Sequence, residues 1–160
     1  MKSEPVQEHR WLRRLLGEWS FEHECPGGPD QPPVKSRGTE AVRAIGDLWV
    51  VAEGQGTMPD GSPATMVLTL GYDPRKGRFV GTWTGSMMTH LWVYDGELDA
   101  GRNRLALYAD GPSFTDPTKT ARYCDAIEFL ADDHRTLTSS VLGEDGNWTT
   151  FMTAHYRRTK

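Results

Sequence analysis

Apolar residues recur at helical spacing in only one segment of the chain, close to its N-terminus. Between residues 8 and 16 they fall on one face of a helix, at Trp11, Leu12, Leu15 and Leu16. Gly17 follows directly, and glycine commonly ends helices because it tolerates a left-handed backbone. The pattern therefore predicts one short helix over about residues 8–16.

Beyond Gly17 the chain consists of short segments that alternate apolar and polar positions or are rich in β-branched and aromatic residues, as strands are. Turn-forming residues separate these segments about every ten positions. The 17 glycines and 10 prolines fit such frequent interruption. We predict ten strands, at about 18–25, 35–45, 48–57, 64–72, 78–84, 89–97, 103–109, 120–130, 135–143 and 147–157.

The connections between these strands determine the expected fold. Most are short enough for hairpins, which make neighbouring strands antiparallel, while two longer loops at 26–33 and 111–119 fit the rim of a cavity. Closing such a meander into a barrel removes its unpaired edges. A two-sheet sandwich is the alternative, but few segments are long enough for its crossover connections. We expect an all-β, antiparallel up-and-down barrel at about 18–158, in one domain spanning residues 1–160.

Charge and hydropathy narrow the possible partners. The 18 Lys and Arg residues against 22 Asp and Glu give a net charge of −4, which offers no basic surface for nucleic acid or anionic lipid. No apolar run approaches the roughly 20 residues of a membrane span, and residues 1–5 lack the apolar centre of a signal peptide. We expect a cytoplasmic protein without nucleic-acid or membrane partners, in which Cys25 and Cys124 are free thiols.

Motifs that carry metal or cofactor chemistry are missing from the sequence. No histidine or cysteine stands in a zinc-binding spacing, and there is no phosphate-binding loop or nucleophile elbow. We therefore expect no metal and no cofactor, and we assign no catalytic residue. The histidines are His9, His23, His90, His134 and His155.

The junction between the predicted helix and the first strand carries a recognisable tripeptide. Gly17-Glu18-Trp19 resembles the glycine-x-tryptophan signature of lipocalin-like (calycin) barrels. In that superfamily the tryptophan lies at the closed end, and a basic residue of the last strand packs over its ring. The resemblance implies that Trp19 closes the barrel with Arg158, or with Arg157 if the last strand has the opposite facing.

A second resemblance covers nearly the whole chain. Several stretches, in order along the sequence, are similar to the bacterial family called domain of unknown function 1579. It implies a calycin-like barrel and no established activity. The stretches are 9–12, 17–19, 70–74, 79–82, 85–94 and 151–156.

One strand carries the strongest candidate for a ligand site. Alternation places His90, Trp92 and Tyr94 on one face, and Trp83 belongs to the neighbouring strand. If that face points inward, these four side chains form an apolar wall with a few polar tips, as small-molecule pockets have. In the alternative, Leu91 and Val93 fill the core and Trp92 covers a dimer contact.

The facing of the last strand is open from sequence. Strict alternation puts Trp148, Thr150, Met152, Ala154 and Tyr156 on one face and His155 on the other. If His155 faced inward it could serve a pocket, or haem as in barrels of the nitrobindin kind. Most charged residues within strands are expected on the outer face. They are Arg43, Glu53, Arg122, Asp125 and Glu128.

Three functional hypotheses follow. The first is a barrel that binds a small apolar or aromatic ligand against Trp83, His90, Trp92 and Tyr94. The second is an enzyme that uses His90 or His155 as a general base, with a carboxylate such as Glu53 or Asp125 in reach. The third is a fully packed structural barrel that acts as a homodimer.

Overall fold

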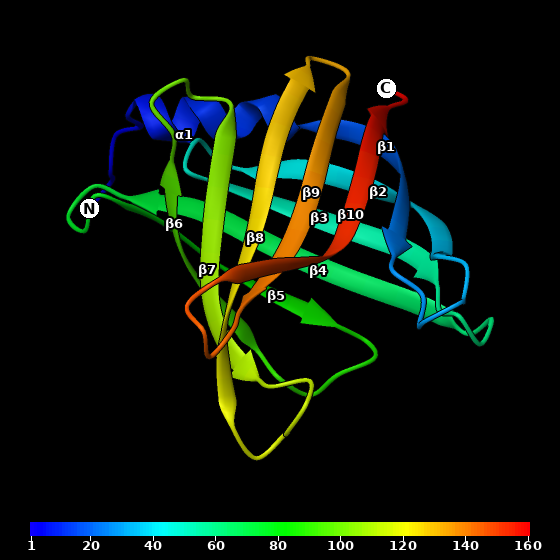
Figure 1. The fold of residues 1–160 in the computed structure, drawn as a ribbon. Helices are drawn as coiled ribbons and strands as arrows, with labels where there is room; N and C mark the ends of the chain where they lie inside the picture. The colour runs from blue at the N-terminus through cyan, green and yellow to red at the C-terminus, as the bar shows by residue number, and fades with distance from the viewer.

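In the computed structural model, which describes residues 1–160, one short helical segment precedes ten strands (Figure 1). The helix α1 (Gln7–Leu12) continues as a 3-10 turn, η1 (Arg13–Leu15). The strands are β1 (Gly17–Cys25), β2 (Val34–Ile45), β3 (Trp49–Thr57), β4 (Pro63–Asp73), β5 (Arg78–Gly85), β6 (Trp92–Leu98), β7 (Arg104–Pro112), β8 (Thr120–Ala131), β9 (His134–Leu142) and β10 (Trp148–Arg158). The chain has no helix with the length and hydrophobicity of a membrane span.

The ten strands form one closed antiparallel barrel. Each strand pairs with its neighbours in sequence, and β1 pairs with β10 to close the ring. The predicted up-and-down barrel is therefore confirmed, and the sandwich alternative is wrong. Hairpin connections explain this order, because a chain that turns back at every strand end can only add each strand beside the previous one.

The seventh strand runs to Pro112 instead of ending at residue 109, and two further predicted elements differ from those observed. The sixth strand begins at Trp92, not at residue 89. Residues 86–91 form a turn and a loop, and the pairing between β5 and β6 starts only at Trp83 and Trp92. The helix predicted over 8–16 tightens into a 3-10 turn after Leu12. Such tightening is common at helix ends, where the last carbonyl groups take partners outside the helix.

The core beneath the helical segment is fully buried. Leu12 and Trp19 are each 1% exposed, and the Trp11 ring meets the Phe129 ring edge-on at a centroid distance of 5.7 Å. These side chains, together with inward residues of the strands, fill the end of the barrel that α1 covers (Figure 1). The apolar face that predicts the helix is thus the face that plugs the barrel.

A β-bulge in β10 overturns the prediction of strict alternation. The register with β9 shifts between Thr150 and Met152, which inserts an extra residue. Ala154 and Tyr156 are buried inside, whereas Trp148 lies outside, 44% exposed, and Thr150 bonds to the outward Ser140 at 3.0 Å. Trp148 and Thr150 therefore do not share the inner face of Ala154 and Tyr156.

The two cysteines are free.

Candidate ligand-binding site

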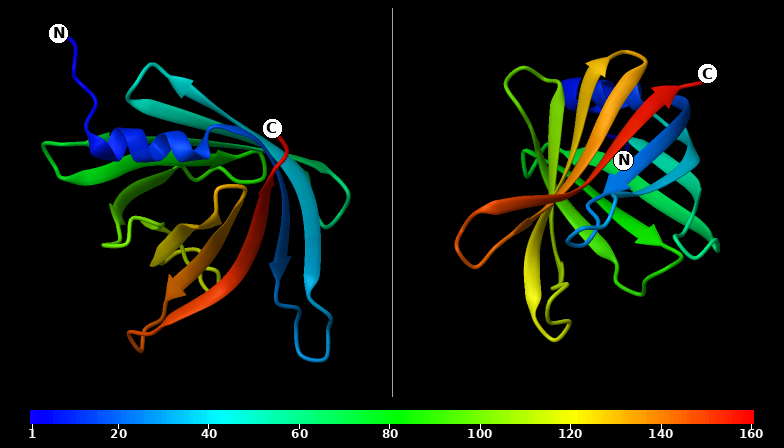
Figure 2. Two further views of the ribbon diagram at one scale, coloured as in Figure 1. Left: turned by 90° about the horizontal axis from the view of Figure 1, so that it is seen from above. Right: turned by 45° about the vertical axis from the view of Figure 1, so that its right-hand side comes forward.

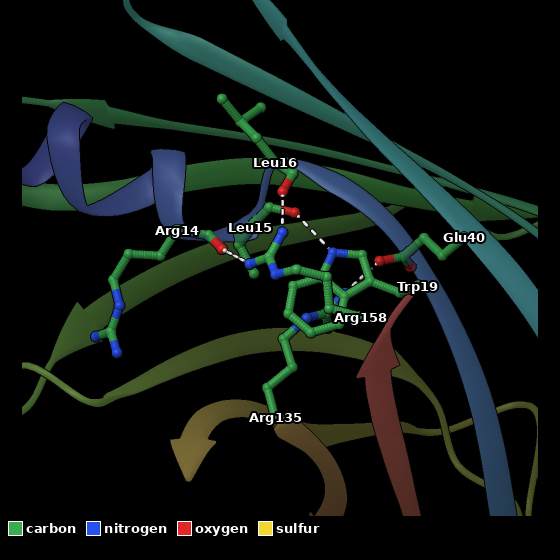
Figure 3. A network of polar contacts seen from close by, with 7 residues as sticks. All are labelled: Arg14, Leu15, Leu16, Trp19, Glu40, Arg135 and Arg158. Carbon is green, nitrogen blue, oxygen red and sulfur yellow. Dashed lines mark hydrogen bonds and ion pairs between the residues drawn. The ribbon is translucent and has the colours of Figure 1, made fainter. Parts of the chain in front are cut away.

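At the covered end of the barrel, a polar network holds the helical segment to the last strand (Figure 3). The Arg158 guanidinium lies 4.2 Å from the centre of the Trp19 ring and donates to the carbonyl groups of Arg14 and Leu16. Trp19 Nε1 donates to the Leu15 carbonyl at 2.9 Å. These contacts satisfy carbonyl groups that a helix end leaves without partners. The covered end is consequently shut by both packing and hydrogen bonds.

A second arginine lies beneath the same tryptophan. Arg135 is within 4.5 Å of the Trp19 ring centre and 4.0 Å of the Tyr156 ring centre, and its guanidinium forms an ion pair with Glu40 (Figure 3). Both side chains face the interior, and Arg135 Nε has no hydrogen-bond partner. Burial, and then the nearby Glu40 carboxylate, raise the pKa of Tyr156.

The half of the barrel away from the helix, here called the open half, contains inward residues that are only partly buried. Inward residues near the helix, such as Leu70 and Leu105, are fully buried. In the other half, several inward apolar residues keep part of their surface accessible. These partly exposed residues are Met66, Leu68, Trp83, Trp92, Leu137 and Met152.

The structure places three of the four candidate wall residues on the inner face of this open half. Trp83 and Trp92 lie directly opposite each other on β5 and β6, and Tyr94 follows on the same face of β6. Leu91 and Val93 are exposed, 50% and 60%, so the alternative in which they fill the core is wrong.

His90 does not lie on the strand. It belongs to the loop before β6, where its ring meets Trp92 edge-on at 4.7 Å. Its Nε2 donates to the Asp110 carbonyl at 3.0 Å. His90 is therefore at the edge of the wall rather than within it.

Small residues on β7 let side chains of β6 and β8 meet across it. The inward positions of β7 here are Ala109 and Gly111, and a Cβ on Gly111 would lie 2.3 Å from the Trp92 ring. Trp92 therefore reaches Tyr123 on β8, with ring centroids 5.0 Å apart. Two residues further along β6, the Tyr94 hydroxyl likewise reaches across β7 and donates to the Asp125 carboxylate on β8.

Asp125 is the polar centre of this wall. Its second carboxylate oxygen accepts from the Ser139 hydroxyl at 2.6 Å, opposite the oxygen that accepts from Tyr94. Burial raises the pKa of Asp125, while these two hydrogen bonds act in the other direction. The expected outer position of Asp125 is wrong. Arg43 and Glu53 lie outside, as expected.

A cleft of about 1030 Å³ opens between β1 and β10. Strand pairing there ends at Glu24 and Thr153, and the two strands diverge beyond it (Figure 2). Phe151 lines this cleft and lies 6.2 Å from the Tyr123 ring, so the cleft borders the aromatic side chains of the open half. Its polar lining comes mostly from outward positions, namely Ser20, Glu22, Glu24, Arg37, Thr153, His155 and Arg157.

Comparison with known proteins shows the family. The family model described as a protein of unknown function (DUF1579) matches residues 4–158. The chain belongs to the DUF1579 family. No curated protein sequence matches it.

Solved structures similar to this DUF1579 protein share its barrel. The Rv2717c protein from M. tuberculosis has a TM-score of 0.62 at 15% identity, covering 98% of this chain and 100% of that one. An S-type phycobiliprotein lyase from Guillardia theta has a TM-score of 0.59 at 13% identity, covering 97% and 94%. A de novo designed fluorescence-activating β-barrel reaches 0.50 at 13% identity, covering 97% and 100%. At these identities the likeness shows the fold alone.

Several polar residues in the interior of the DUF1579 protein cannot be predicted from the sequence. Glu40, Arg135 and Ser139 carry no motif, and their partners come from distant strands. Only strand alternation could have indicated the position of Asp125. It is two residues from Tyr123 and from Ile127, so it lies on the same face of the strand as those two large side chains.

Asp125 makes the stability of the DUF1579 protein depend on pH. Since its folded-state pKa lies above the unfolded value of about 3.9, the folded state binds more protons between the two values. This contribution to stability is present at low pH and is lost as the pH rises through that window. Urea unfolding at a series of pH values is therefore expected to show Asp125→Asn gaining stability relative to wild type from about pH 4 upward. A difference that does not change with pH would contradict this account.

Proposed function

We propose that this DUF1579 protein binds a small, largely apolar or aromatic molecule in the open half of its barrel, against Trp83, Trp92 and Tyr94. The observation that supports this most directly is the contrast between the two halves. Trp83 and Trp92 keep accessible surface, while Leu12, Trp19 and Leu105 at the covered end are fully buried. An apolar wall with a few convergent polar groups is typical of ligand pockets, and Tyr94, Asp125 and Ser139 supply such groups here.

The acid–base alternative receives less support from the geometry. A general base needs an orienting partner, commonly a carboxylate, within hydrogen-bond reach. His90 bonds to a backbone carbonyl group, and His155 lies on the outer face, where its ring nitrogen is 2.9 Å from that of His134. The outward position of His155 also removes it as an internal haem ligand. Partly exposed interior residues argue against a fully packed structural barrel.

Tryptophan fluorescence tests the binding proposal. Titration with a panel of small aromatic and apolar molecules is expected to change the emission of the wild-type protein. Trp92→Ala is expected to weaken the binding of any ligand found by about tenfold or more, since a large apolar contact is lost. Trp49→Ala is the matched control, because Trp49 lies outside the barrel over Gly71.

Two results would count against this site. An emission spectrum that no member of the panel alters would remove the binding proposal. Equal weakening by Trp92→Ala and Trp49→Ala would place any ligand elsewhere. His90→Ala tests whether His90, at the edge of the wall, contributes to binding. An unchanged affinity would remove His90 from the site.

A further inference from the structure

Two carboxylates face the interior of the barrel, and they differ in their partners. Glu40, near the covered end, is neutralised by Arg135. Asp125, in the open half, accepts hydrogen bonds only from the neutral hydroxyls of Tyr94 and Ser139. None of the ion pairs of the chain includes Asp125. The open half thus contains an inward carboxylate without a counter-charge.

The two arginines that face the interior already have other partners. Arg135 is held by Glu40 and stacked on Tyr156, and Arg158 is held by the backbone carbonyl groups of the helical segment. A carboxylate in such surroundings costs free energy unless a positive group meets it. The residues of this chain do not supply that group, whereas a ligand can, because Asp125 keeps accessible surface.

The side chains around Asp125 suit a positive charge attached to an apolar body. Tyr94 contacts the carboxylate directly, and the Trp92 and Tyr123 rings meet one step along the same wall. Aromatic faces attract ammonium groups, most strongly where water is excluded. Two hydroxyl donors fix the carboxylate while leaving lone pairs for a further donor. Charge, aromatic surface and hydrogen bonding therefore favour the same class of molecule.

We propose that Asp125 is the counter-ion for the protonated amine of a small ligand whose apolar body packs against Trp83 and Trp92. This rests on the proposed function, to which it adds the ligand class: an organic amine with an aromatic or aliphatic body. The ammonium group donates to the Asp125 carboxylate, and such a charge-assisted hydrogen bond is stronger than one to a neutral donor.

Three probes that share a phenyl group separate charge from apolar contact. They are 2-phenylethylamine, 2-phenylethanol and 3-phenylpropanoate, each titrated into the protein by calorimetry at neutral pH. The amine is expected to bind at least about tenfold more tightly than the alcohol, and the carboxylate more weakly than the alcohol. In Asp125→Asn the advantage of the amine over the alcohol is expected to be lost. Glu53→Gln, an outward carboxylate on β3, is expected to keep the full preference.

The failures are distinguishable. If the alcohol binds and the amine has no advantage, or if Asp125→Asn keeps the advantage, the amine assignment is overturned and the proposed function stands. If none of the probes binds, the amine assignment is also overturned, and the wider fluorescence panel decides the proposed function by itself. Should Asp125→Asn fail to fold, carboxyl-carbon NMR of the wild-type protein replaces it. The amine must shift the Asp125 resonance and the alcohol must not.

Discussion

Trp19→Ala is expected to lower the free energy of unfolding by about 3–5 kcal/mol, the range for removing a large buried aromatic side chain. The ring is 1% exposed and lies between two guanidinium groups, those of Arg158 and Arg135. Its removal leaves a void that the closed sheet cannot fill by collapsing. It also removes the donor to the Leu15 carbonyl, at the junction that holds the helical segment to the barrel.

Urea unfolding followed by circular dichroism measures this loss. Trp148→Ala is the matched control, because the Trp148 ring lies on the outside of the barrel, 44% exposed, beside the Tyr108 ring. We expect the control to cost less than about 1 kcal/mol, as most surface substitutions do. Equal losses in the two variants would show that the covered end does not depend on Trp19.

Local signals in the sequence are sufficient to predict the barrel. Glycine, proline and aspartate in the turns mark where each strand ends, and the alternation of Met66, Leu68 and Leu70 correctly predicts an inner face. Order along the chain then becomes order around the barrel, because every connection is a hairpin. This is why the strand bounds inferred from residues alone agree with the structure to within about three positions.

What the sequence could not predict depends on contacts between distant residues. The bulge between Thr150 and Met152 breaks the alternation of β10 without any glycine or proline to mark it. The general rarity of buried carboxylates predicts an outer position for Asp125, which is wrong. Its inward position requires Tyr94 and Ser139, which only the closed barrel brings together. Composition and sequence motifs therefore predict the barrel, whereas its buried polar contacts form only between residues that folding brings together.

Breaking the ion pair inside the covered half is expected to have an effect of similar size. Glu40→Ala should lower the free energy of unfolding by about 3–5 kcal/mol, because it leaves the buried Arg135 charge without compensation. Arg135 has little capacity to find another partner, since its Nε already lacks one and its faces are covered by Trp19 and Tyr156.

The double variant Glu40→Met/Arg135→Met separates charge from packing. Removing both charges and retaining apolar volume is expected to recover most of the loss, as apolar residues often replace a buried ion pair without cost. Urea unfolding of the four proteins gives the coupling between the two positions. Losses that simply add would contradict a direct interaction. Because the pair lies in the covered half, the double variant should also keep the affinity of wild type for 2-phenylethanol, as expected for a ligand bound in the other half of the barrel.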